Sequence, residues 1–320
     1  MERDSHEWKR LMDAYTLEEE LRNARYEGVK TLEERIKFRV STLKYQLLPH
    51  YFSGVPSWRL KLRSLGGPRT LPDFACVGPI KSGTSDLSTY MFQHPCIMAP
   101  LAKEVTSASH KEWLLYYPTV KEKEKEKVAR EHGKALSGYF TPAMHSLPLM
   151  DSFHEARPHG KVILLVRNPV DRAYSHYKWD LLIGGKRWLK HPYYKSFSGH
   201  IDMALDFFPA VKFPSRASNS ELLQSGIYVK AVELWMERFG RENVRVVRAE
   251  DFFKDPAATV CELHEFLGLT PIKPQIHEIA NQNVIKAPPF EKETRAKLQA
   301  FYKPWNEKLY ALLDRDMGWG

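Results

Sequence analysis

The stretch FACVGPIKSGTSDLSTYMFQHP, residues 74–95, decides the fold of this chain. Four mostly apolar residues lead into a turn built around Gly78 and Pro79. Lys-Ser-Gly-Thr follows at residues 81–84, and then comes an apolar-patterned run that is typical of a helix. This order predicts a strand, a phosphate-binding loop and a helix. The loop differs from that of nucleotide triphosphatases, in which two glycines precede the lysine.

The predicted loop has the chemistry of an anion site. Backbone N–H groups at the start of a helix, together with the helix dipole, form a cradle for an anion. Lys81 adds a positive charge, and the side chains of Thr84 and Ser85 add hydroxyl donors. We expect the cradle to consist of Ser82, Gly83, Thr84 and Ser85, with Gly83 allowing the ligand to approach closely.

Composition sets broad limits on function. The chain has 320 residues, 43% hydrophobic and 27% charged, which is ordinary for a globular protein. A net charge of +9 suits an anionic ligand, a membrane surface or nucleic acid and does not distinguish among them.

The three cysteines, Cys76, Cys96 and Cys261, form no CxxC pair and suit no zinc site, so we expect reduced thiols. The charged N-terminus has no signal peptide, and no run is apolar enough to span a membrane, so a cytoplasmic location is expected.

Apolar periodicity predicts the order of the elements. Residues 1–70 are expected to form an N-terminal helical extension, with helices in 5–48 and an irregular connector at 50–73, and residues 71–320 the main domain. Strands are predicted at 74–78, 136–140, 161–169 and 243–252. Helices are predicted after the first and third strands, at 226–240, at 255–269 and from 292 to the end, with a long loop at 184–220. The alternation indicates an α/β fold of three layers, P-loop-like, with a central parallel sheet flanked by helices.

Parallel sheets bind ligands at the carboxyl ends of their strands. This rule places the first loop, Arg167 and the segment after Ala249 on one rim. Arg167 at a strand end and Ser175 on the next helix could hold one phosphate between a guanidinium and a hydroxyl. A surface arginine and an ordinary helix serine remain the alternative.

Two segments resemble a known family. IKSGTSDLSTYMFQHPCI, residues 80–97, resembles the 5′-phosphosulfate loop of sulfotransferases that use 3′-phosphoadenosine 5′-phosphosulfate (PAPS). VILLVRNPVDRAYSHY, residues 162–177, resembles their 3′-phosphate motif. Both look most like the heparan sulfate and related carbohydrate sulfotransferases, and the likeness extends over roughly residues 70–320. The resemblance implies PAPS as the donor, adenosine 3′,5′-bisphosphate (PAP) as the product, and no metal.

The resemblance also implies an in-line sulfuryl transfer with named residues. Lys81 would neutralise the leaving group, and fixed positive charge would supply much of the rate. The family's general base is a glutamate in a Lys-Glu pair, which matches Lys103 and Glu104. The family usually continues with aromatic residues, whereas VTSAS follows here, and His110 is the competing base because a histidine serves in the cytosolic branch.

Two further positions match the family near the nucleotide. Tyr228 lies in a Gly-x-Tyr sequence whose tyrosine is near the 3′-phosphate, and core packing at a helix start is the alternative. Lys286 lies in NQNVIKAPPF, residues 281–290, in the place of a late loop that closes over the nucleotide. The family's disulfide near this loop is not expected, because only Cys261 is nearby.

The expected acceptor is inferred from the N-terminal part of the sequence. The relatives that look most similar are Golgi enzymes with a membrane anchor, whereas this sequence starts with a charged helix. We therefore expect a soluble biosynthetic enzyme that sulfates a hydroxyl or amine of a small molecule, such as an alkaloid toxin, with no nucleic acid or membrane partner. A glycan acceptor is the alternative. A P-loop kinase and a non-catalytic module that binds a nucleotide or glycan are further alternatives.

Overall fold

The computed structural model describes residues 55, 57–105, 110–125, 135–184, 196–208, 219–276 and 290–320. The helices expected in 5–48 and the side chain of Lys286 lie outside these residues. The chain divides into two compact units. The sheet unit comprises Arg39–Arg167 and Lys230–Gln282, and the helical unit comprises Met1–Phe38, Asn168–Val229 and Asn283–Gly320. The predicted domain boundary at residue 70 stays a prediction.

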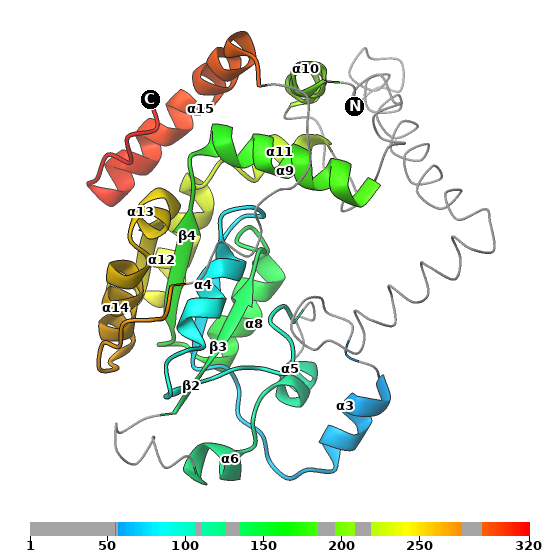
Figure 1. The fold of residues 1–320 in the computed structure, drawn as a ribbon, viewed down its shortest axis with the longest axis vertical. Helices are drawn as coiled ribbons and strands as arrows, with labels where there is room; N and C mark the ends of the chain where they lie inside the picture. Colours follow the sequence, from blue (N-terminus) through cyan, green and yellow to red (C-terminus); the bar gives the residue numbers. More distant parts are fainter. Residues whose placement is uncertain are drawn as a thin grey trace, which may run out of the picture. The chain divides into compact units, whose positions relative to one another are not determined.

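In its described part, the sheet unit contains five strands, all paired in parallel, in the order β2-β3-β1-β4-β5. Figure 1 labels β2, β3 and β4 of this sheet. The strands are β1 (Phe74–Val77), β2 (Ile97–Met98), β3 (Leu136–Thr141), β4 (Lys161–Val166) and β5 (Val244–Arg248). β1 lies between β3 and β4, so that Val77 is opposite Thr141 on one side and Leu164 on the other. The predicted parallel α/β sheet is therefore confirmed.

Helices cover both faces of this sheet. In the residues that the structure describes, the helices of the sheet unit are α3 (Ser57–Ser64), α4 (Thr84–Met91), α5 (His110–Tyr116), α6 (Val120–Lys125), α8 (Leu147–Ala156), α12 (Val229–Phe239), α13 (Ala249–Lys254) and α14 (Pro256–Leu267), with a short 3-10 turn at Arg241–Asn243. Cys76 of β1 and Ile163 of β4 share a buried cluster with residues of α4 and α14. On the other face, the ring of Trp113 in α5 packs at a tilt against that of Tyr139, with 4.9 Å between the ring centres, and lies 6.4 Å from the ring of Phe153 in α8. β1 and β4 read as continuous apolar runs because a parallel strand is buried on both faces.

The helical unit consists, in its described part, of α9 (Pro169–Gly184), α10 (Phe197–Phe207), α11 (Asn219–Gln224) and α15 (Lys292–Leu313). A buried guanidinium ties two of these helices together: Arg172 of α9 donates to the carbonyl of Leu222 in α11. The hydroxyl of Tyr302 in α15 donates to the carbonyl of Leu223 at 3.1 Å. Buried carbonyls near the end of α11 thus receive donors from two neighbouring helices, which satisfies groups that a helix end leaves open.

Three expectations about elements were wrong. The segment 50–73, expected to be irregular, contains α3. The segment 184–220, expected to be a loop, contains α10, whose N-cap Ser196 accepts from the N–H of Gly199 at 3.0 Å. The strand expected at 243–252 ends at Arg248, and the remaining residues begin α13.

The physical reason is that short helices depend on tertiary burial. In α13, Phe252 enters the core, and Arg248 pairs with Asp251 at 3.0 Å across the first turn. In α10, Phe197, Ile201 and Ala204 bury one helical stripe. Such segments are too short to hold a helix by propensity alone, so packing decides their conformation.

The central strands should dominate stability. Ile163→Ala removes a fully buried side chain between two packed layers, and we expect a loss of about 2–5 kcal/mol in the free energy of unfolding. Ile276→Ala is the matched control, because the side chain of Ile276 is 57% exposed, and it should cost less than about 0.5 kcal/mol. Urea denaturation of both variants measures the difference. Equal losses would contradict the described core.

Candidate active site

The parallel sheet brings the chain segments that carry the candidate site residues to one edge. Because every strand points the same way, the residues that follow β1, β2, β4 and β5 emerge at the carboxyl edge. These segments are the loop that contains Lys81, the Lys103-Glu104 pair, Arg167 and the start of α13. The rule for parallel sheets predicts all of these segments on this rim except the Lys-Glu pair.

The loop after β1 is shaped by close contacts. Lys81 and Gly83 both have positive backbone φ angles, 69° and 103°, and Gly83 is the N-cap of α4. A Cβ atom at Gly83 would lie 2.8 Å from the ring of Phe253, and one at Gly78 would lie 2.4 Å from the hydroxyl of Ser82. Neither position has room for a side chain, and Gly83 also has a positive φ angle, so both positions require glycine.

Ser82 acts inside the loop. Its side chain is fully buried, and its hydroxyl and its N–H both donate to the carbonyl of Pro79, at 2.8 and 3.2 Å. The first bond within α4 runs from the N–H of Leu87 to the carbonyl of Gly83 at 3.0 Å. The N–H groups of Thr84 and Ser85 come before that first bond, where the N–H groups of a helix have no acceptor within the helix. We therefore expect the anion cradle to consist of Gly83, Thr84 and Ser85, with Ser82 holding the loop in shape.

Arg167 touches the loop directly. It is the first residue after β4, and its Nη1 donates to the carbonyl of Lys81 at 3.1 Å. Its guanidinium carbon lies 5.7 Å from the centre of the Phe253 ring. This contact follows from the direct pairing of β1 with β4. The structure thus brings together the two elements that the sequence assigned to anion binding.

The Lys103-Glu104 pair lies against the start of α4. The Lys103 ammonium donates to the hydroxyl of Ser85 at 2.8 Å and to Oε1 of Glu104 at 2.7 Å. One ammonium therefore links the candidate base to the phosphate loop. The next carbonyl, that of Val105, accepts from the buried hydroxyl of Tyr139 at 2.8 Å, and burial raises the pKa of that hydroxyl.

The rival base stays open. His110 is the first residue of α5, but its side chain lies outside the part of the chain that the structure describes. Lys103 and Glu104 are described, with side chains 13% and 34% exposed, so the glutamate is only partly shielded from solvent. Glu104 is thus the candidate whose position relative to the loop is defined.

Two predicted nucleotide contacts belong to the helical unit. Ser175 lies half-buried on α9. Tyr228 is buried, and its ring meets that of Trp319 edge-on at 5.8 Å, which agrees with the packing alternative. The pairing of Ser175 with Arg167, and the role of Tyr228 at a 3′-phosphate, stay predictions, as does the contact by Lys286.

Sequence reasoning missed one contributor, Phe253. It packs against Gly83 and beneath Arg167, and it directly follows the strand predicted at 243–252, in a stretch that forms α13. The two adjacent aromatic residues at 252 and 253 were the sequence feature that could have indicated this contact.

The described residues hold no candidate metal site: none of their His, Cys, Asp and Glu side chains form a group of three or more that could hold a metal ion.

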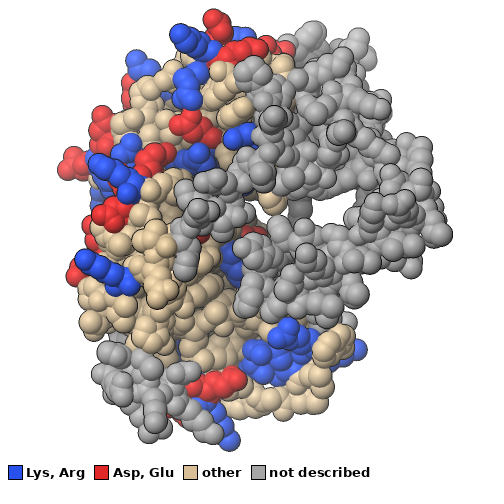
Figure 2. All heavy atoms as spheres, viewed as in Figure 1, with Lys and Arg blue, Asp and Glu red and all other residues tan. Residues whose placement is uncertain are grey.

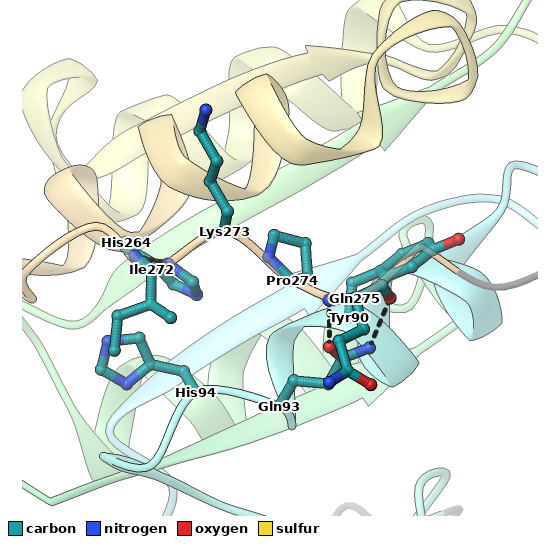
Figure 3. A pocket seen from close by; sticks show the side chains of 8 residues that line it. All are labelled: Tyr90, Gln93, His94, His264, Ile272, Lys273, Pro274 and Gln275. Carbon is teal, nitrogen blue, oxygen red and sulfur yellow. Dashed lines mark hydrogen bonds between the residues drawn. The ribbon is translucent and has the colours of Figure 1, made fainter.

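A separate cavity of about 420 Å³ lies in the sheet unit, beyond the end of α4 (Figure 3). Since α4 begins at the carboxyl edge and runs back across the sheet, its end lies toward the amino edge. The cavity lining includes Gln93 and His94 on one side and His264 with Lys273 on the other. This cavity is therefore distinct from the phosphate loop.

Side chains at this cavity hold the segment that follows α14. Gln93 exchanges two hydrogen bonds with the backbone of Gln275, at 3.1 and 2.6 Å. His94 Nε2 lies 3.0 Å from the carbonyl of Thr270, and its Nδ1 accepts from the N–H of Cys96 at 3.0 Å, so that both ring nitrogens have a backbone partner. The ring of His264 meets that of His94 at 4.4 Å.

Comparison with known proteins identifies the class. The profile of the sulfotransferase domain matches residues 71–307, and the chain therefore belongs to the sulfotransferase family. The crystal structure of a sulfotransferase from Alicyclobacillus acidocaldarius is 25% identical, with a TM-score of 0.56, and the match covers 78% of this chain and 98% of that one. By family, the protein is a PAPS-dependent sulfotransferase.

Two curated relatives illustrate the range of the family. The membrane-associated sulfotransferase kil1 of Dictyostelium discoideum is 23% identical over 82% of this chain and 71% of its own length. The heparan sulfate glucosamine 3-O-sulfotransferase 3B1 of Mus musculus is 27% identical over 79% of this chain and 66% of its own length. The chain thus spans about two thirds of the length of these relatives.

The histidine pair predicts a pH dependence of stability. The pKa of His264 is lowered to about 4 by burial and by the nearby His94. In the unfolded chain, His264 has the ordinary histidine pKa of about 6.5, so it binds a proton there at a higher pH than in the folded protein. The free energy of unfolding therefore decreases as the pH falls from about 6.5 to about 4. In His264→Asn, the slope of unfolding free energy against pH in this window should be shallower by about one proton, or about 1.4 kcal/mol per pH unit.

The measurement is urea denaturation at several pH values between 4 and 7. His159→Asn is the control, because His159 lies at an exposed turn. An unchanged slope in His264→Asn would mean that His264 does not titrate as the buried geometry requires.

Proposed function

We propose that this protein transfers a sulfuryl group from PAPS to a hydroxyl or amino group of a saccharide, with Glu104 as the general base. The observation that carries the proposal is the Lys103 ammonium, which joins Glu104 to Ser85 at the phosphate loop. A carboxylate at the start of a phosphate-binding helix is placed to take a proton from an acceptor that attacks a group bound there.

The saccharide is favoured over the small-molecule acceptor that the sequence suggested. A relative with 27% identity is named for heparan sulfate glucosamine. The small-molecule expectation rested on the N-terminal residues, which lie outside the described part of the chain. The cytoplasmic location stays a prediction: no described helix has the length and apolar character to cross a bilayer, and one relative is named membrane-associated.

The donor supplies a sulfuryl group whose bond to the bridging oxygen of the 5′-phosphate breaks during transfer. Lys81, the N–H groups of Thr84 and Ser85 and the dipole of α4 would stabilise the charge on that oxygen. Arg167 would bind the nucleotide's 3′-phosphate through its guanidinium fork. Thus charge stabilisation, rather than covalent chemistry by the protein, is the role of this edge.

Glu104 would accept the proton of the acceptor group as the new bond to sulfur forms. Lys103 keeps the carboxylate beside Ser85 and offsets its negative charge near an anionic donor. Because the Lys103 ammonium contacts both Glu104 and the loop, it can also stabilise negative charge on the sulfuryl group during transfer.

Removal of the loop lysine should reduce catalysis. Lys81→Ala is expected to lower kcat by about a hundredfold, comparable with the loss of one donor to a transition-state charge. The control is Lys273→Ala, because Lys273 lines the cavity beyond the end of α4 and should leave kcat unchanged. Steady-state transfer from radiolabelled PAPS measures both variants. Near-normal turnover in Lys81→Ala would remove the assigned role.

The base is tested by a pair of variants. Glu104→Gln should abolish transfer while leaving PAP affinity within about threefold, because the amide keeps the shape but cannot take a proton. His110→Ala should retain most of the activity. The reverse outcome, an inactive His110→Ala and an active Glu104→Gln, would assign the base to the histidine.

The acceptor is tested with radiolabelled PAPS and a panel of desulfated heparan oligosaccharides, simple alcohols and amines. We expect label on the oligosaccharides and none on the small molecules. Transfer to small molecules alone would return the assignment to the first expectation. PAP binding without transfer to any glycan or small acceptor would instead favour a non-catalytic module, and magnesium-dependent turnover of ATP would favour a kinase.

A further inference from the structure

Helix α3 exposes a stripe of large apolar side chains. Trp58 and Leu62 are each 60% exposed, and Leu65, in the turn that closes the helix, is 82% exposed. The spacings of four and three residues place all three side chains on one side of the helix. In the described part of the chain, the other large exposed hydrophobic side chains are Leu147 in α8 and Ile276 in the segment after α14.

Cations flank this stripe. The helix sequence, SWRLKLRS, contains Arg59 and Lys61 and no acidic residue, and none occurs between residues 57 and 72. At 100° per residue, Arg59 and Lys61 fall on opposite sides of the stripe. Figure 2 shows Lys and Arg side chains beside uncharged ones over the position of α3, at the lower right of that view. The surface is therefore apolar at its centre and positive at both margins.

The stripe is held in place by the opposite side of the helix. Arg63 donates through Nε to the carbonyl of Leu115 at 2.7 Å and through Nη2 to that of Tyr117 at 2.9 Å. Arg69 donates to the same Tyr117 carbonyl at 2.8 Å and to the carbonyl of Arg63. These half-buried bonds hold α3 against the end of α5, so the apolar stripe is a fixed surface.

We propose that α3 docks on an anionic lipid membrane, with its apolar stripe in the interfacial region and Arg59 and Lys61 against the lipid headgroups. An amphipathic helix with a tryptophan and leucines on one face and cations beside them is suited to that interface. Three side chains cover too little area for a stable protein partner, which buries about 800 Å² on each side. The proposal departs from the expectation of no membrane partner and is independent of the acceptor.

The test is flotation of the full chain with vesicles. One set is phosphatidylcholine with about one third phosphatidylserine, and the other is phosphatidylcholine alone. The wild-type protein should float with the anionic vesicles and much less with the neutral ones. The variant Leu62→Ser/Leu65→Ser should show a partition coefficient lower by about tenfold or more, and Arg59→Gln/Lys61→Gln should lose the preference for anionic lipid.

Leu147→Ser/Ile276→Ser is the matched control, because it removes two exposed apolar side chains elsewhere in the sheet unit and should bind vesicles like the wild type. The melting temperature and PAP binding of each variant report folding separately from docking. Wild-type protein that stays with no vesicle, or equal flotation of Leu62→Ser/Leu65→Ser, overturns the proposal. So does a dimer that the stripe variant turns into a monomer, since a second copy would then cover α3.

Discussion

The direct pairing of β1 with β4 is the constraint on which the site depends. Because Val77 lies opposite Leu164 in a parallel register, both strands end at the same edge, and the residues after them must meet. The result is the bond from the guanidinium of Arg167 to the carbonyl of Lys81. The register is fixed in turn by burial on both faces, since a slip of one residue would turn every core side chain to the wrong layer. Core packing and anion binding are thus two consequences of one pairing.

The two edges of the sheet serve different purposes. The carboxyl edge gathers cations and helix N–H groups, and Lys103 carries the candidate base to the loop. The end of α4 toward the amino edge brings together the rings of His94 and His264 and the amide of Gln93, which hold the segment after α14. Cys76, in the strand between them, is unreactive because burial raises the pKa of its thiol to about 12.

The sequence predicted what depends on long apolar runs and on strand ends. FACV and VILLV indicated buried parallel strands, and the loop and Arg167 followed from the rule for such sheets. It did not predict α3, α10 or α13, because short helices form only where tertiary contacts bury one side of them. It also could not show that Ser82 turns inward, since that depends on the position of the Pro79 carbonyl across a loop pinched at Gly78. The contact of Lys103 with Ser85 joins residues whose pairing has no signature in spacing.

The central claim is that the Lys81 loop and Arg167 hold the two ends of one bisphosphorylated nucleoside. Isothermal titration calorimetry of PAP and of adenosine 5′-monophosphate, with the wild type and with Arg167→Gln, tests it most directly. The account predicts that the wild type binds PAP more tightly by about tenfold to a hundredfold, the value of a charged hydrogen-bonded pair, and that Arg167→Gln loses this preference. Equal affinity of the wild type for both nucleotides, or a preference that survives in Arg167→Gln, would contradict the account.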